Sequence, residues 1–473
     1  MNKKISFAAT LLLAAVSLAA GKIEFSFKTN KADAIYKAGD KIVFTAKMTE
    51  DGAAAADKKI RYRLYHDHRV VKKGDVSAAD GLTLETSSKT PGWIFIQVWA
   101  VDAKGKFIKK LDKKGKEVAV SSGIGAMVEP EKLLPPLPEP ADFDEFWNSV
   151  KAELAAVPMK ELERKPVADK RANVYDIKVS CAGEKPVSGY LCVPKNAKPK
   201  SCPAYVSFHG AGVGSANKPV AMAARGLIAL DINAHGIING QPPKFYQNLR
   251  DKYYYTTHDE FRKTRYALWN KHDRDLYYFK GMYMRLMRAL EYIKSQPEWD
   301  GKHLIVVGAS QGGAQVLAAC GLDKDITFAR CGVPAQCDHS GCLGNRRSGW
   351  PGLYTANDHE KNPAYAKCAS YYDGAYFAKR VKCPIYINTG FMDSVCPPSS
   401  VFAAYNSIPA GVEKHMQTSP TGGHGTPHTE GQKALNDYIN SILKKITAQN
   451  EQTVFPPAGA CCCAFSGGSN ILF

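Results

Sequence analysis

The chain has 473 residues, of which 45% are hydrophobic and 10% aromatic, and it carries a formal net charge of +18. This length points to two or three domains, and the composition excludes a disordered or fibrous chain. The lysines are scattered and no nucleic-acid-binding motif is present, so we expect no nucleic-acid partner; the charge is interpreted as solvated surface, with attraction to an acidic polysaccharide or cell envelope as the alternative.

The first twenty residues have the pattern of a secretory signal peptide. Lys3 and Lys4 precede an apolar run from Ile5 to about Ala20 that ends in small residues. The run is shorter than the ~20 residues that a bilayer crossing needs, and no cysteine follows it for a lipid anchor. We therefore expect residues 1–20 to be a cleaved signal peptide, the protein to be secreted or periplasmic, and no membrane span elsewhere.

Residues 22–125 are expected to form a small all-β domain, an immunoglobulin-like sandwich. Short strands are predicted at 41–48, 60–64 and 94–101, separated by turns that contain Gly, Asp and Lys. No catalytic constellation is visible in this region. Residues 126–141 are rich in proline and lack periodicity, which predicts a semi-rigid linker.

Strands and helices alternate in the region that follows, residues 142–447. A helix is predicted at 142–154 and a strand hairpin at 174–193. Further strands are predicted at 204–208, 227–232, 304–307, 384–389 and 413–418, with amphipathic helices between and after them. The alternation indicates the α/β class, a mostly parallel sheet with helices on both faces.

Two segments depart from this pattern. Residues 237–275 are rich in Tyr, Arg, Lys and Asp and are long for a loop, so we interpret them as a lid or an oligomer contact. Residues 448–473 have weak periodicity and are predicted to be a weakly ordered tail.

The chain has thirteen cysteines, and this odd number forbids complete intramolecular pairing. Export would permit disulfides, with connectivity open among the clustered candidates Cys331, Cys337, Cys342, Cys368, Cys383 and Cys396. The spacing is a poor match to a zinc site, so we expect no metal.

The strongest local motif is the G-x-S-x-G pattern centred on Ser310. It follows an apolar strand and precedes a stretch compatible with a helix, which is the context of a nucleophile elbow. A serine hydroxyl needs a base and an orienting carboxylate to act as a nucleophile at neutral pH. In this fold the carboxylate and then the histidine follow the serine along the chain.

Asp393 comes just after the strand predicted at 384–389, where a carboxylate reaches the same sheet edge as Ser310. His424 lies in a Gly-Gly-His-Gly loop after the next strand and is the favoured base, with His428 as its rival. The backbone N–H groups of Gln311 and Ala211 are the candidate oxyanion donors, because each lies directly after a strand at this edge.

These segments resemble the acetyl xylan esterase/cephalosporin C deacetylase family of the α/β-hydrolase superfamily. The resemblance rests on GASQGG at 308–313, on GFMD and VCPP within 390–398 and on His424, and covers roughly residues 130–446. It implies a hydrolase that removes acetyl groups from xylan or xylo-oligosaccharides, and a homo-oligomer. It also assigns Ser310 as nucleophile, Asp393 as orienting group and His424 as base.

Two positions depart from the family pattern. Members often carry Arg-Gly-Gln-Gly where this chain has Asn233-Ala234-His235-Gly236, and often have Glu where Gly425 follows the histidine. The departures concern residues that support the site, so they bear on the substrate and on the family's hexameric ring rather than on the fold.

We therefore predict a secreted serine esterase that deacetylates acetylated oligosaccharides or polysaccharides through an acyl-enzyme and needs no cofactor. One alternative is another hydrolase of this fold that acts on a different ester or on a peptide. The other is a glycan-binding or scaffold protein with an inactive hydrolase domain, against which the intact set of Ser310, Asp393 and His424 argues.

Overall fold

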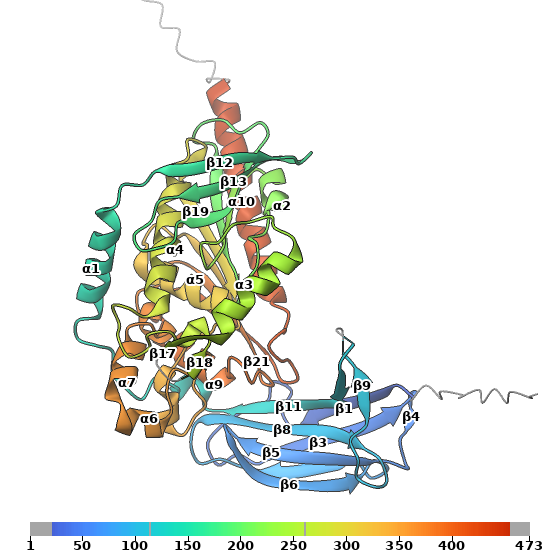
Figure 1. The fold of residues 1–473 in the computed structure, drawn as a ribbon. Helices are drawn as coiled ribbons and strands as arrows, with labels where there is room; N and C mark the ends of the chain where they lie inside the picture. Colours follow the sequence, from blue (N-terminus) through green and yellow to red (C-terminus); the bar gives the residue numbers. More distant parts are fainter. Residues whose placement is uncertain (1–20, 113–114, 260–261, 455–473) are drawn as a thin grey trace, which may run out of the picture.

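The structure, a computed structural model, describes residues 21–454 except 113–114 and 260–261. It has an N-terminal all-β region and a larger α/β domain, and the all-β region lies below the α/β domain in Figure 1. The predicted signal peptide at 1–20 lies outside the described residues.

Two main sheets build the N-terminal region. Its strands are β1 (Ile23–Thr29), β2 (Ile35–Tyr36), β3 (Ile42–Glu50), β4 (Ala53–Ala54), β5 (Lys59–His66), β6 (Arg69–Ser77), β7 (Leu82–Thr86), β8 (Gly92–Val101), β9 (Lys109–Leu111), β10 (Glu117–Ala119) and β11 (Ser121–Val128). One sheet has the order β1-β3-β4 with β7 also on β3, and the other has the order β2-β11-β8-β5-β6. In β3, alternate side chains such as Phe44 and Ala46 are buried, as the two-residue period of a strand requires.

The sheet of the α/β domain has nine strands, in the order β12-β13-β14-β16-β15-β19-β20-β21-β22. Their bounds are β12 (Glu161–Val167), β13 (Ala172–Val179), β14 (Val187–Pro194), β15 (Cys202–Phe208), β16 (Ile228–Ile232), β19 (Trp299–Ala309), β20 (Phe328–Gly332), β21 (Ile385–Gly390) and β22 (Lys414–Ser419). The pairs from β12 through β16 are antiparallel and all later pairs are parallel. The sheet is therefore mixed and mostly parallel.

Helices cover both faces of this sheet. They are α1 (Phe143–Ala155), α2 (Val220–Ala224), α4 (Tyr278–Lys294), α5 (Gln311–Leu322), α6 (Ala356–Lys361), α7 (Pro363–Ser370), α8 (Gly374–Ala378), α9 (Pro398–Ser407) and α10 (Thr429–Val454). Trp147, Leu286 and Val316 bring α1, α4 and α5 into the core on one face. Leu435 and Ile439 of α10 pack with α2 on the other face. Short 3-10 turns η1 (Pro130–Lys132) and η3 (His339–Gly344) lie in the connections.

The segment interpreted as a lid or oligomer contact, 237–275, has secondary structure of its own. It contains α3 (Pro243–Tyr255), the hairpin of β17 (Thr256–Asp259) and β18 (Arg262–Thr264), and η2 (Tyr266–Leu268). Its role as a lid stays a prediction. Two predicted boundaries also differ from the observed elements: β11 runs to Val128, inside the predicted linker, and α10 runs to Val454, beyond the predicted start of the tail. Residues 455–473 lie outside the described residues.

All ten cysteines in the described part of the chain are free, including the six disulfide candidates. The Sγ atoms of Cys320 and Cys383 lie 4.0 Å apart and are not bonded. Cys461, Cys462 and Cys463 are not described.

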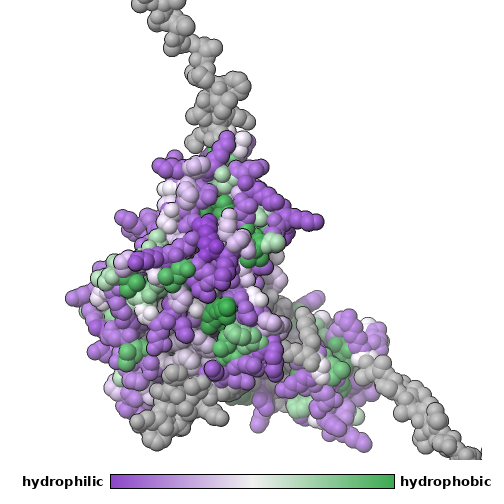
Figure 2. Space-filling view, turned by 45° about the horizontal axis from the view of Figure 1, so that its top comes forward, coloured by the Kyte–Doolittle hydropathy of each residue, from purple (hydrophilic) through white to green (hydrophobic). Residues whose placement is uncertain are grey.

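On the face shown in Figure 2, hydrophilic residues dominate and hydrophobic ones form separate patches. Within residues 21–454 as described, we find no helix with the length and apolarity of a membrane span.

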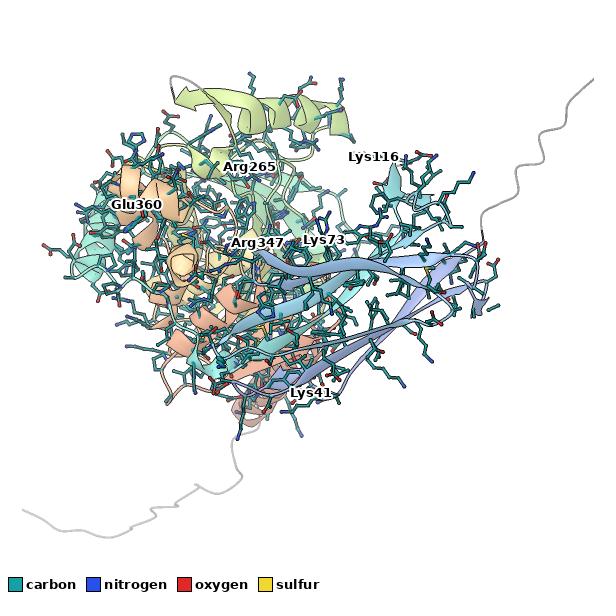
Figure 3. The ribbon with its side chains drawn as sticks, turned by 90° about the horizontal axis from the view of Figure 1, so that it is seen from below. Lys41, Lys73, Lys116, Arg265, Arg347 and Glu360 are labelled. Carbon is teal, nitrogen blue, oxygen red and sulfur yellow. The ribbon has the colours of Figure 1, made fainter. Side chains whose placement is uncertain are left out.

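The β-region packs against the end of the α/β domain where the parallel strands finish (Figure 1). Phe391 and Phe402 of the α/β domain belong to the hydrophobic core of the β-region. Across the contact, the Arg347 N–H donates to Asp67 Oδ1 at 3.4 Å. Figure 3, seen from below, labels Arg347 and also Lys73, which belongs to the strand β6 that follows Asp67.

Candidate active site

Ser310 stands on a tight turn between β19 and α5. Its φ of 58° lies in the left-handed region, where a residue other than glycine is strained. Gly312 makes the turn fit, because a Cβ at this position would lie 2.3 Å from the backbone oxygen of Phe208. The G-x-S-x-G motif thus forms the strand–turn–helix geometry that the sequence predicts, with the serine at the carboxyl end of β19.

The structure brings the three predicted catalytic side chains together. His424 Nε2 lies 2.9 Å from Ser310 Oγ, and His424 Nδ1 lies 2.8 Å from Asp393 Oδ2. With the neutral ring protonated at Nδ1, that nitrogen donates to the carboxylate and Nε2 accepts from the serine hydroxyl. This is the geometry that lets a histidine act as base toward a serine.

Asp393 is fully buried and its second oxygen is also engaged. Oδ1 accepts hydrogen bonds from the backbone N–H groups of Val395 at 2.8 Å and Cys396 at 2.9 Å. These bonds fix the carboxylate and hold the other oxygen toward His424. We call residues 390–396 the acid loop.

The acid loop packs against the N-terminal β-region. The indole N–H of Trp93 in β8 donates to the backbone oxygen of Phe391 at 2.7 Å, and Trp93 is 1% exposed. Gly125 of β11 comes so close that a Cβ there would lie 2.2 Å from the same Phe391 oxygen. Gly125 N–H also donates to Pro420 O at 2.8 Å, in the connection that leads to His424. Sequence reasoning missed these contacts, which join residues about 300 positions apart.

The rival histidine does not reach the serine. Both ring nitrogens of His428 are buried and have no hydrogen-bond partner within the described structure. Burial, together with the charge of Arg330, lowers the pKa of His428 to about 4. The geometry therefore favours His424 as the base.

The two predicted oxyanion donors lie near the serine. Gln311 is the first residue of α5, so its N–H has no partner within that helix, and the helix N-terminus adds a positive dipole. Ala211 belongs to residues 209–214, the oxyanion loop, whose Gly210 approaches Ser310: a Cβ there would lie 3.9 Å from Ser310 Cβ. Neither N–H hydrogen-bonds to another described residue. Both are thus available to a ligand.

His235 holds the oxyanion loop through a hydrogen bond to its backbone. This residue was not recognised from the sequence as part of the site. Its Nε2–H donates to Gly212 O at 2.8 Å, which leaves Nδ1 to accept from the Tyr278 hydroxyl at 2.5 Å. Burial lowers the pKa of His235 to about 3, so the ring is neutral at ordinary pH. His235 occupies the place of the family's Gln, and this departure was the available signal.

One group near the triad has the donor types of a metal site. Asp393, Cys396 and His424 offer atoms within 4.8 Å of one another. Both ring nitrogens of His424 are already used by Asp393 and Ser310, so a metal would have to break this chain of hydrogen bonds. Burial and the nearby Asp393 carboxylate raise the pKa of the Cys396 thiol, which keeps it protonated. The arrangement fits acid–base chemistry better than metal binding.

A serine, an aspartate and a histidine at the carboxyl edge of this sheet, in this chain order, define the protein as an α/β-hydrolase. The family model described as acetyl xylan esterase (AXE1) matches residues 131–439. The chain therefore belongs to the acetyl xylan esterase family and is a carboxylic ester hydrolase, which confirms the resemblance drawn from the sequence.

Individual relatives agree with this assignment. The chain is 32% identical over 306 residues to the acetyl esterase Axe7A of Xylanibacter ruminicola, which covers 62% of this chain and 67% of the relative. An acetyl xylan esterase from Paenibacillus sp. R4 superimposes with a TM-score of 0.56 at 27% identity, over 66% of this chain and 98% of that one. Acetyl xylan esterase 1 from Thermoanaerobacterium sp., at 24% identity and a TM-score of 0.55, shares the fold over 66% of this chain and 97% of its own.

Proposed function

We propose that the protein is a secreted serine esterase that removes acetyl groups from acetylated xylan or xylo-oligosaccharides. The observation that carries the proposal is the unbroken chain of hydrogen bonds from Asp393 through His424 to Ser310. The substrate class is taken from the family and from the names of the relatives.

In the first half of the reaction, Ser310 Oγ attacks the acetyl carbonyl while His424 Nε2 takes the hydroxyl proton. Asp393 keeps the imidazole in the tautomer with Nδ1 protonated and stabilises the cation that forms. The N–H groups of Gln311 and Ala211 hold the negative oxygen of the tetrahedral intermediate. When the intermediate collapses, His424 returns the proton to the departing sugar hydroxyl.

In the second half, water replaces the sugar. His424 takes a proton from the water, whose oxygen attacks the acetyl-serine carbonyl, and the same two N–H groups hold the oxyanion again. Collapse releases acetate and returns the proton to Ser310 Oγ. Every proton transfer uses His424, so the cycle needs no cofactor.

Three further properties belong to this proposal. Export rests on the signal-peptide pattern of residues 1–20. The two-sheet arrangement of β1 to β11 supports an immunoglobulin-like sandwich for the N-terminal region. Assembly into a homo-oligomer follows from the family resemblance and stays a prediction.

Acetate release tests the proposal. The parent is offered acetylated xylo-oligosaccharides and a p-nitrophenyl ester series of rising acyl length. We expect acetate release with a sharp preference for acetyl. Ser441 is an exposed serine on α10, so Ser441→Ala serves as the control for replacing a serine far from the site and should behave as the parent. A folded parent that releases no acetate from either set would contradict the deacetylase assignment and favour another ester, a peptide or a binding role.

A further inference from the structure

The mechanism leaves most of the active-site groove without a role. The groove has a volume of about 610 Å³, and its walls include Ser310 and His424 together with Asp231, Lys218 and Arg330. Asp231, Ser207, Val307 and Arg330 are register neighbours on four adjacent strands, β16, β15, β19 and β20. Side chains in such a row share one face of a sheet, so a strip of three polar residues and Val307 leads along this face close to the nucleophile.

The acidic side chain of this strip is already engaged. Asp231 is 4% exposed and accepts hydrogen bonds from the Ser207 hydroxyl, from the His209 ring and from the Asn217 N–H, the last at 2.8 Å. It makes no ion pair with Arg330. The groove therefore holds two cations, Arg330 and Lys218, and one carboxylate whose hydrogen bonds go to other residues.

Arg330 is the most unusual member of the strip. Its side chain is partly buried, its Nε is fully buried without a partner, and it makes no hydrogen bond or ion pair with any residue of the described structure. Taking a charge out of water without a partner is costly, so such a guanidinium is expected to have a ligand. Its planar set of N–H donors matches the two oxygens of a carboxylate.

Neighbouring groups fit an anion as well. The Lys218 ammonium lies 5.1 Å from the centre of the Tyr190 ring and makes no ion pair with a described residue. His428, whose pKa is influenced by Arg330, is neutral at ordinary pH, so the cations here are Arg330 and Lys218. The net charge of +18 also favours approach of an acidic polymer.

We propose that this groove binds a carboxylate group of the substrate through Arg330, assisted by Lys218. The preferred ester is then an acetylated oligosaccharide that carries a uronic acid close to the acetylated sugar. This inference rests on the proposed deacetylase function and specifies its substrate.

The test compares two acetylated xylo-oligosaccharides that differ only in one group: a uronic acid substituent, or the same substituent with its carboxyl reduced to an alcohol. We expect the parent to have a kcat/KM about tenfold higher for the acidic substrate, and Arg330→Met to bring this ratio close to one. Arg171→Met, which changes an exposed arginine outside the groove, should keep the parental ratio. Equal kcat/KM values for the two substrates in the parent would overturn the inference while leaving the deacetylase function intact, whereas no turnover of either would refute the function itself.

Inhibition of the parent gives a second measurement that does not depend on the folding of a variant. With p-nitrophenyl acetate as substrate, free glucuronate should inhibit at a concentration about tenfold lower than glucose does. Acetate must inhibit less than glucuronate, because the groove is assigned to a sugar-borne carboxylate. Inhibition by acetate as strong as that by glucuronate would assign Arg330 to the reaction product and overturn the inference.

Discussion

The acid loop is contacted by the N-terminal β-region, whereas the oxyanion loop is held by residues of the α/β domain itself. Trp93 and Gly125 of the β-region contact Phe391 and the connection before His424, so the segments that carry two of the three triad residues are contacted from outside the α/β domain. His235 and Tyr278 hold the oxyanion loop from within that domain. The β-region therefore supplies contacts that hold the acid loop and the connection before His424.

Replacing the nucleophile should lower kcat more than any change in the two loops. Ser310→Ala should lower kcat for p-nitrophenyl acetate at least about 10⁴-fold, because no other group in the described site can form the acyl-enzyme. Steady-state kinetics measure the loss, and circular dichroism checks the fold. A loss below about tenfold would mean that the two loops do not serve Ser310 at all.

Removing the support of the oxyanion loop should have the next largest effect. His235→Phe eliminates the donor to Gly212 O, so we expect kcat to fall about 100-fold with little change in KM, as for a misplaced oxyanion donor. Tyr278→Phe keeps the donor and loses only the bond to Nδ1, and should cost less. A rise in KM at constant kcat would show instead that His235 supports substrate binding.

The same residue predicts a pH effect on stability. The pKa of His235 is lowered from 6.5 in the unfolded chain to about 3 in the folded protein, so the unfolded chain binds the additional proton between these values. Folding stability from this group is therefore present above pH 6.5 and is lost as the pH falls. The difference in unfolding free energy between the parent and His235→Phe should shift by about 2 kcal/mol, to the disadvantage of the parent, between pH 7.5 and pH 5. Urea denaturation at both pH values measures it, and a constant difference would contradict a buried neutral ring.

Weakening the contact from the β-region should have a moderate effect on catalysis. Trp93→Phe removes the donor to Phe391 O, and we expect a destabilisation of about 1–3 kcal/mol and a fall in kcat of about fivefold. Trp99→Phe, in the same strand, is the matched control, because Trp99 packs against Phe107 within the β-region. Equal effects of the two variants on kcat would show that the β-region does not position the acid loop.

The smallest effect should come from another buried hydrogen bond across the same contact. Ser399→Ala removes the hydroxyl that donates to Asp67 Oδ1 at 2.9 Å, between α9 and the β-region. We expect about 1 kcal/mol of lost stability and an unchanged kcat, because the acid loop keeps its bond to Trp93. Thermal unfolding and steady-state kinetics check this, and a clear fall in kcat would extend the positioning role to the whole interface.

Local patterns carried the sequence predictions of the fold. Strands with a plain apolar run, such as β15 and β21, were placed within a few residues. β12 was missed because its charged sequence belongs to an edge strand, and β20 because Arg330 interrupts a short strand. Both features reflect tertiary surroundings that a periodicity does not contain.

In the site too, the residues with a local sequence pattern were predicted and those that depend on tertiary packing were not. Ser310 is marked by its own motif, and Asp393 and His424 by their positions after strands. His235 and Trp93 act through backbone contacts that depend on the final packing, and Trp93 lies 298 residues from its partner. The charged groove around Arg330 likewise appears only when neighbouring strands are aligned.

The most direct test of the central claim is labelling with an activated p-nitrophenyl phosphonate ester, which forms a stable adduct with an active serine nucleophile. We expect loss of esterase activity in proportion to one adduct on the peptide that contains Ser310, and no adduct in His424→Ala, because the hydroxyl then lacks its base. Mass spectrometry of the digested protein locates the adduct. Full activity after exposure to the phosphonate, or an adduct on another residue such as Cys396, would contradict the catalytic roles proposed for Ser310, His424 and Asp393.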